Sequence, residues 1–147
     1  MNVKTLDITI IAWLQRSFVP LARLAIFAVY FWFGILKLLD LSPASPLAQA
    51  LAAQTIGAQH FDLAFNILAV FECLIGILFL IPKATRVVIP LLLAHMVIVC
   101  SPLFLIPDQA WSKLLVPTLE GQYIIKNMAI IALAIGVAAQ TRPLKAR

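Results

Sequence analysis

Charged residues are scarce in this sequence: Lys, Arg, Asp and Glu make up 12% of its 147 residues, whereas 63% are hydrophobic. The apolar share of a soluble domain is only about half. The scarcity of charge therefore excludes an ordinary soluble domain and indicates a membrane protein. At this length the protein is expected to form a single integral membrane domain over residues 1–147, and its spans leave no room for a separate soluble catalytic domain.

Cysteine is also rare, with two residues, Cys73 and Cys100, and no Cys-x-x-Cys pair. Quinone-linked disulfide oxidoreductases need a closely spaced and accessible pair, so dithiol chemistry is not expected. The sequence shows no serine triad, phosphate-binding glycine loop or carboxylate dyad, and His95 has no second strong metal ligand at a matching depth. We therefore expect no catalytic residue, no metal site and no catalytic activity of this chain alone.

Long apolar runs, by contrast, are plentiful. A membrane-spanning helix needs about 20 apolar residues, and the stretches 18–39, 63–81, 87–106 and 119–139 are long enough. They lack the alternating pattern of transmembrane β-barrel strands, and a helix satisfies its own backbone hydrogen bonds, as lipid requires. The expected fold class is all-α, a bundle of four transmembrane helices.

Two shorter helices are expected outside the spans. Apolar residues recur at helical spacing over 6–14 and predict an amphipathic helix in the membrane interface, which leads into the first span through Pro20. After that span, serine followed by proline occurs at 42–43 and again at 45–46, a pattern typical of a helix start. We expect a short helix in this loop, on the outer surface.

The distribution of lysine and arginine predicts the orientation in the membrane. Seven of them fall in the N-terminal arm, the turn after the second span and the C-terminal tail: Lys4, Arg16, Lys83, Arg86, Arg142, Lys145 and Arg147. The opposite loops offer Lys113. By the positive-inside rule both termini are cytoplasmic. The net charge of +5 is then explained by contact with anionic lipid headgroups, and no nucleic-acid partner is expected.

Polar side chains inside the spans predict a polar pocket in the outer half of the bundle. Glu72 and His95 fall near the middle of their spans, where a charge costs at least ~2.5–3.5 kcal/mol and usually finds a partner inside the protein. The expected pocket residues are Lys37, Asn66, Glu72, His95, Glu120, Gln122, Tyr123, Lys126 and Asn127.

Two lysines are candidates for the cation that pairs with Glu72. Lys126 is the first choice, because the second and fourth spans run in the same direction and helix side chains lean toward the N-terminus. Lys37 is the second choice, reaching inward from the first span. Either lysine could instead extend to the nearest membrane surface, and the pair could fix helix register as readily as it could bind a ligand or a proton.

The order of these residues along the spans resembles that of a known family. The matching positions are Arg23, Gly34 and Lys37, then Glu72 and Gly76, then Lys126 and Asn127. With these residues in this order, the chain resembles the DoxX-like family of small bacterial four-helix membrane proteins. That family takes its name from a subunit of a thiosulfate:quinone oxidoreductase, and some relatives are linked to oxidative-stress or thiol-redox complexes. The resemblance implies a multi-pass protein of the bacterial inner membrane.

Three functions remain open at this point. The first is a non-catalytic DoxX-like subunit or binding module, whose outward-facing pocket holds a lipophilic or quinone-like molecule or docks a redox partner. The second is a proton-coupled small transporter centred on Glu72. The third is a structural accessory subunit of a larger membrane complex or a homo-oligomer. No cofactor is required by the sequence, and a quinone or a lipid is the ligand expected for the first function.

Overall fold

Helices dominate the structure, a computed structural model that describes residues 2–141 and 143 and is 83% helical. Four stretches are long and apolar enough to cross a membrane: Val3–Leu38, Ala58–Phe79, Pro82–Leu105 and Leu119–Ala139. They contain the long helices α1 (Val3–Leu38), α3 (Phe61–Phe79), α4 (Thr85–Cys100) and α7 (Leu119–Ala139). The predictions of an all-α fold and of four membrane-length helices are confirmed.

Short elements connect the long helices. Helix α2 (Ser45–Thr55) and the 3-10 turn η1 (Ala58–His60) follow α1, and the 3-10 turn η2 (Pro82–Ala84) joins α3 to α4. Helices α5 (Pro102–Leu105) and α6 (Pro107–Ala110) lead into a small antiparallel hairpin of β1 (Trp111–Lys113) and β2 (Val116–Pro117). The hairpin was not expected from the sequence.

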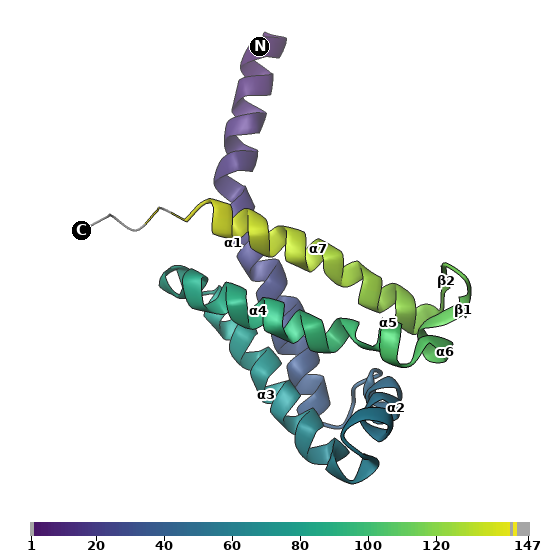
Figure 1. Cartoon of the computed structure of the whole chain (residues 1–147). Coiled ribbons are helices and arrows are strands. Elements are labelled where there is room, and N and C mark those ends of the chain that lie inside the picture. Colours follow the sequence, from purple (N-terminus) through teal and green to yellow (C-terminus); the bar gives the residue numbers. More distant parts are fainter. Residues whose placement is uncertain (1, 142, 144–147) are drawn as a thin grey trace.

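The long helices form two neighbouring pairs. In Figure 1, α4 and α7 run side by side in opposite directions, and α1 crosses both while packing most extensively against α3. The bundle has two ends, which we name by their connections. The turn end holds η2 and the C-terminal end of α7, and the loop end holds α2, η1, α5, α6 and the hairpin.

The N-terminal amphipathic helix and the first span were expected as two elements, and this is wrong. They form one helix of 36 residues, with Pro20 inside it. Proline removes one hydrogen bond from a helix interior, but membrane-spanning helices tolerate it, because neighbouring groups satisfy the freed carbonyl. The N-terminal part of α1 extends beyond the other helices at the turn end (Figure 1).

Several span boundaries also differ from those predicted. Helix α3 begins and ends two residues earlier than the 63–81 stretch, and α4 ends at Cys100 rather than at 106. The reason is Pro102, which cannot donate a backbone hydrogen bond, so that α5 starts as a separate helix. Helix α7 covers 119–139 as expected, because the Thr118 side chain accepts a hydrogen bond from the Gly121 backbone N–H at 3.1 Å.

The expected loop helix is present as α2, with Pro46 in its first turn. Only the second of the two Ser-Pro pairs begins a helix. At the first pair, the Ser42 side chain accepts a hydrogen bond from the Ala44 backbone N–H at 3.3 Å and stabilises a turn instead.

The apolar core lies between the turn end and the middle of the bundle. Its buried members come from all four long helices: Ile26, Tyr30, Ile75, Phe79, Val88, Leu92, Met96 and Ala134. Two glycines allow α1 and α3 to approach closely beside this core. A Cβ atom on Gly34 would lie 2.8 Å from the Ala69 carbonyl oxygen, and one on Gly76 would lie 3.0 Å from the Phe31 nitrogen. Small residues at such crossings are typical of membrane helix packing.

The Gly34 crossing can be tested by Gly34→Ala. The added methyl group would meet the Cys73 sulfur at 2.6 Å and also the Ala69 carbonyl oxygen at 2.8 Å, and the backbone of α3 cannot move aside as a side chain can. We expect a loss of about 1–3 kcal/mol in the free energy of unfolding, measured as a lower melting temperature in detergent. The matched control is Gly136→Ala, whose methyl group would meet the tip of the Phe18 ring at 2.7 Å. An equal loss in both variants would contradict a special role for the α1–α3 crossing.

Candidate functional site

A chain of hydrogen bonds links four ionisable side chains from three helices. Lys37 of α1 donates to Glu72 Oε2 of α3, with Nζ at 2.6 Å. His95 of α4 lies with its Nε2 3.0 Å from Glu72 Oε1, and its Nδ1 is 3.1 Å from the hydroxyl of Tyr30 on α1. We call Tyr30, Lys37, Glu72 and His95 the Glu72 network.

Helical spacing explains how α1 and α3 contribute to this network. Tyr30, Gly34 and Lys37 follow one another at intervals of four and three residues, so they lie on one face of α1. Gly34 brings this face close to α3, where Glu72 lies one turn before Gly76. Both glycines lie on the turn-end side of Lys37 and bring the helices close enough for Lys37 to reach Glu72.

The Glu72 network is withdrawn from the surface. Lys37, Glu72 and His95 expose only 7%, 5% and 3% of their surface. The hydrogen bonds are satisfied if His95 donates from Nε2–H to Glu72 and accepts at Nδ1 from the Tyr30 hydroxyl, an assignment that rests on the hydrogen-bond partners. Within the described part of the chain, every buried side-chain nitrogen or oxygen atom has a hydrogen-bond partner.

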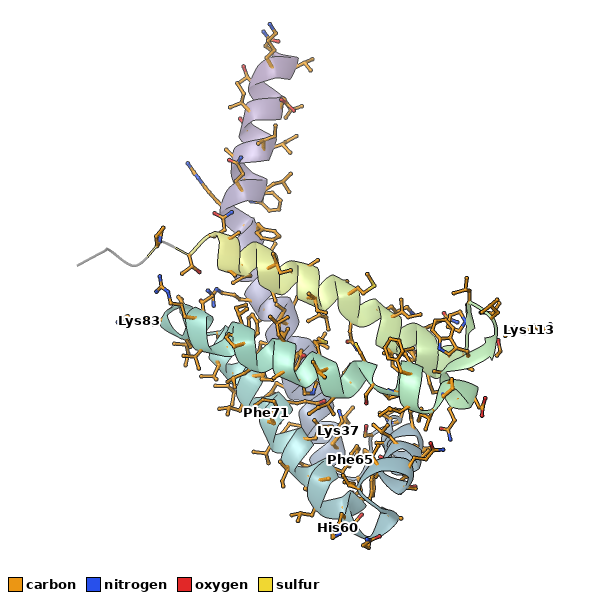
Figure 2. All side chains as sticks on the ribbon, in the orientation of Figure 1. Lys37, His60, Phe65, Phe71, Lys83 and Lys113 are labelled. Atoms are coloured by element: carbon orange, nitrogen blue, oxygen red, sulfur yellow. The ribbon has the colours of Figure 1, made fainter. Side chains whose placement is uncertain are left out.

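Lys37 nevertheless has unused hydrogen-bonding capacity. An ammonium group carries three donors, and the described residues supply one acceptor, Glu72 Oε2. The ammonium also lies 6.0 Å from the centre of the Phe65 ring, and Figure 2 shows Lys37 and Phe65 near each other. Phe65 in turn stacks on Phe61, with ring centres 4.9 Å apart. The side of the network nearest the loop end thus combines a cation with aromatic rings.

The partner of Glu72 is Lys37, so our first choice of Lys126 is wrong. Lys126 is exposed, and its ammonium lies 5.0 Å from the centre of the Tyr123 ring, one turn closer to the start of α7. The physical reason is helix order: α3 packs on α1, whereas α7 packs mainly on α4 and α1. The alternative expectation, that Lys126 extends to the nearest membrane surface, stays a prediction.

The other expected pocket residues do not join the Glu72 network. Asn66, Glu120, Gln122 and Tyr123 are exposed, and Asn127 is half-buried. Of the nine expected residues, the structure brings together Lys37, Glu72 and His95. The sequence interpretation missed Tyr30, although its spacing of seven residues from Lys37 placed both on one face of α1.

Clusters of metal-ligating side chains and paired cysteines are absent among the described residues. These residues contain no group of three or more His, Cys, Asp or Glu that could hold a metal ion. Cys73 and Cys100 are free, and the Cys73 sulfur lies 3.8 Å from the Phe31 carbonyl oxygen in the α1–α3 interface.

Comparison of the chain with protein-family models, with curated proteins and with solved structures found no match.

Removing one charge of the ion pair should lower the free energy of unfolding more than removing both charges. Lys37→Gln or Glu72→Gln leaves the other charge buried without its partner, which typically costs ~3–5 kcal/mol. We expect the double variant to be closer to wild type than either single variant, as measured by unfolding in detergent. Tyr30→Phe should cost roughly 0.5–1.5 kcal/mol, the contribution of one hydrogen bond.

Lys126→Gln is the control for this cycle, because it removes an exposed lysine that has no contact with Glu72 among the described interactions. It should leave the melting temperature nearly unchanged. Strictly additive losses for Lys37→Gln and Glu72→Gln would show that the pair is not coupled.

Proposed function

We propose that this protein is a DoxX-like, non-catalytic binding module of the bacterial inner membrane, and that the Glu72 network forms its ligand site. The ligand is a lipophilic molecule of the quinone class. The observation that carries this proposal is the Lys37 ammonium, which Glu72 holds at 2.6 Å while two of its donors have no acceptor among the described residues.

The chemistry around Lys37 fits a quinone-like ligand. A quinone ring presents carbonyl oxygens, which accept hydrogen bonds from an ammonium group, and its flat ring packs on aromatic side chains such as Phe65 and Phe61. Its apolar tail is soluble in the surrounding bilayer. Binding sites of this kind combine mostly apolar walls with a few well-placed polar groups.

The apolar core favours one-sided access over transport across the membrane. Going from the network toward the turn end, α1, α3 and α4 place Ile26, Ile75, Phe79, Val88 and Leu92 in the bundle interior, all fully buried. This layer contains no polar side chain that would continue the hydrogen-bond chain. The geometry therefore supports a site reached from the loop end more than a proton-coupled transporter centred on Glu72.

The positive-inside rule supports a cytoplasmic turn end. Lys83 and Arg86 belong to the turn end, whereas His60 and Lys113 lie at the loop end (Figure 2). In this orientation both termini are cytoplasmic, and the Glu72 network opens toward the outer half of the membrane. The exposed apolar side chains Trp13 and Leu14 support contact of the N-terminal part of α1 with lipid.

This orientation can be tested by labelling single cysteines in intact cells. In a background with Cys73→Ala and Cys100→Ala, a membrane-impermeant maleimide should label Gln54→Cys on α2 and Lys113→Cys on the hairpin. It should label Lys83→Cys on η2 only after the cells are permeabilised. Labelling of Lys83→Cys in intact cells would reverse the orientation and the direction from which the ligand enters.

Quinone binding can be tested with decylubiquinone and purified protein in detergent. We expect the quinone to raise the melting temperature of wild type. The Lys37→Gln and Glu72→Gln double variant keeps a neutral, hydrogen-bonding pair but loses the ammonium, and should bind at least tenfold more weakly, because a hydrogen bond from a charged group contributes about 1.5–3 kcal/mol. Lys126→Gln should bind as wild type does.

Two outcomes would overturn the quinone proposal. One is a wild-type protein whose melting temperature and bound small molecules do not change with the quinone. The other is a double variant that binds as tightly as wild type. In either case the Glu72 network would serve to hold α1, α3 and α4 together, as in a structural accessory subunit.

A further inference from the structure

A second buried cation, Arg23, lies at the turn end of the bundle. Its Nη1 donates to the Phe79 carbonyl oxygen at 2.9 Å, and its Nη2 donates to Thr85 Oγ1 at 2.5 Å. The Thr85 hydroxyl in turn donates to the Pro82 carbonyl oxygen at 2.7 Å. These bonds connect α1 to the end of α3 and to the turn that follows it, so Arg23 has a structural role.

Among the described residues, no carboxylate forms an ion pair with Arg23. Arg23 exposes only 9% of its surface, and its two acceptors are a carbonyl and a hydroxyl, both of them neutral. Among the described residues, the ion pairs within 4 Å both involve Glu72. In a membrane, a buried guanidinium without a counter-charge is costly, whereas Lys37 on the same helix has its carboxylate.

Arg23 also lines an open cavity of about 400 Å³ between α1, η2 and α7. Gln140 and Thr141 contribute polar groups to the cavity, and Val19 and Val137 contribute apolar ones. None of the described lining residues is acidic. A guanidinium has five donors, and the structure gives two of them acceptors among the described residues. The cavity therefore combines an uncompensated cation, unused donors and an apolar wall.

We propose that this cavity binds the phosphate group of an anionic phospholipid. Arginine suits phosphate because its donors can form two parallel hydrogen bonds with the oxygens. Gln140 and Thr141 can donate further hydrogen bonds to the headgroup, while the acyl chains extend along the apolar surfaces of α1 and α7. Basic pockets between membrane helices are typical sites for anionic lipid headgroups. This proposal does not depend on the quinone proposal, since it concerns the opposite end of the bundle.

The lipid can be tested with the full-length protein in a neutral detergent, after removal of bound lipid. We expect phosphatidylglycerol to raise the melting temperature and to remain bound in native mass spectrometry. Phosphatidylcholine carries the same phosphate but also a choline cation, and should bind at least tenfold more weakly. Inorganic phosphate tests whether the cavity binds a free anion rather than a lipid. If inorganic phosphate raised the melting temperature as much as phosphatidylglycerol does, the lipid assignment would be overturned. Equal binding of the two lipids would overturn it as well.

Variants separate the cavity from the structural role of Arg23. Arg23→Gln should lose the lipid, but it also removes the bonds to Phe79 and Thr85 and could weaken the fold. Thr141→Glu leaves those bonds in place and puts a carboxylate into the cavity. We expect it to melt at or above the wild-type temperature in lipid-free detergent, because the carboxylate compensates Arg23, and to bind phosphatidylglycerol at least tenfold more weakly.

The matched control is Gln54→Glu, which adds the same charge on an exposed position of α2 at the loop end. It should bind phosphatidylglycerol as wild type does. A Thr141→Glu variant with wild-type lipid binding, or a Gln54→Glu variant with the same loss as Thr141→Glu, would exclude the cavity as the lipid site.

Discussion

The ion pair between Lys37 and Glu72 depends on how closely α1 and α3 approach each other. A lysine and a glutamate on neighbouring membrane helices meet at 2.6 Å only if the backbones are close, and Gly34 and Gly76 permit this by leaving out their side chains. Once the pair is fixed, the second oxygen of Glu72 faces α4 and accepts from His95. His95 then orients the hydroxyl of Tyr30 back on α1. One close crossing thus organises three of the four long helices.

Arg23 and Lys37, the buried Lys and Arg side chains of the described residues, have different partners and lie toward opposite ends of the bundle. Lys37 is neutralised by Glu72 inside the protein, whereas the described partners of Arg23 are neutral oxygen atoms. Between the two cations lies the apolar core around Ile75 and Leu92. Among the described residues, no side-chain hydrogen bond joins the Glu72 network to Arg23 across this layer.

The sequence predicted those features of the fold that depend on one helix at a time, such as its length and the positions of its polar residues. The four membrane-length helices and the positions of Glu72 and His95 along them follow from counting residues, because a helix rises by a fixed amount per residue. The partner of Glu72 did not follow, because counting gives depth but not which helix lies next to which. Lys126 and Lys37 were both at a suitable depth, and the packing of α3 on α1 decided between them.

Tyr30 was missed since an uncharged hydroxyl among aromatic residues gives no signal in hydropathy. The hairpin depends on a left-handed backbone at Leu115, with φ of 59°, which a leucine does not indicate.

The continuity of α1 has a mechanical consequence. A helix of 36 residues is about 54 Å long at 1.5 Å per residue, while the hydrocarbon core of a bilayer is about 30 Å thick. Roughly 20 Å of the same rigid rod therefore projects past the membrane or along its surface, with Lys37 at the far end. Pro20 removes one backbone hydrogen bond from this helix, so a bend is most easily accommodated there. The N-terminal segment and Lys37 therefore lie on one continuous helix, with Pro20 between them.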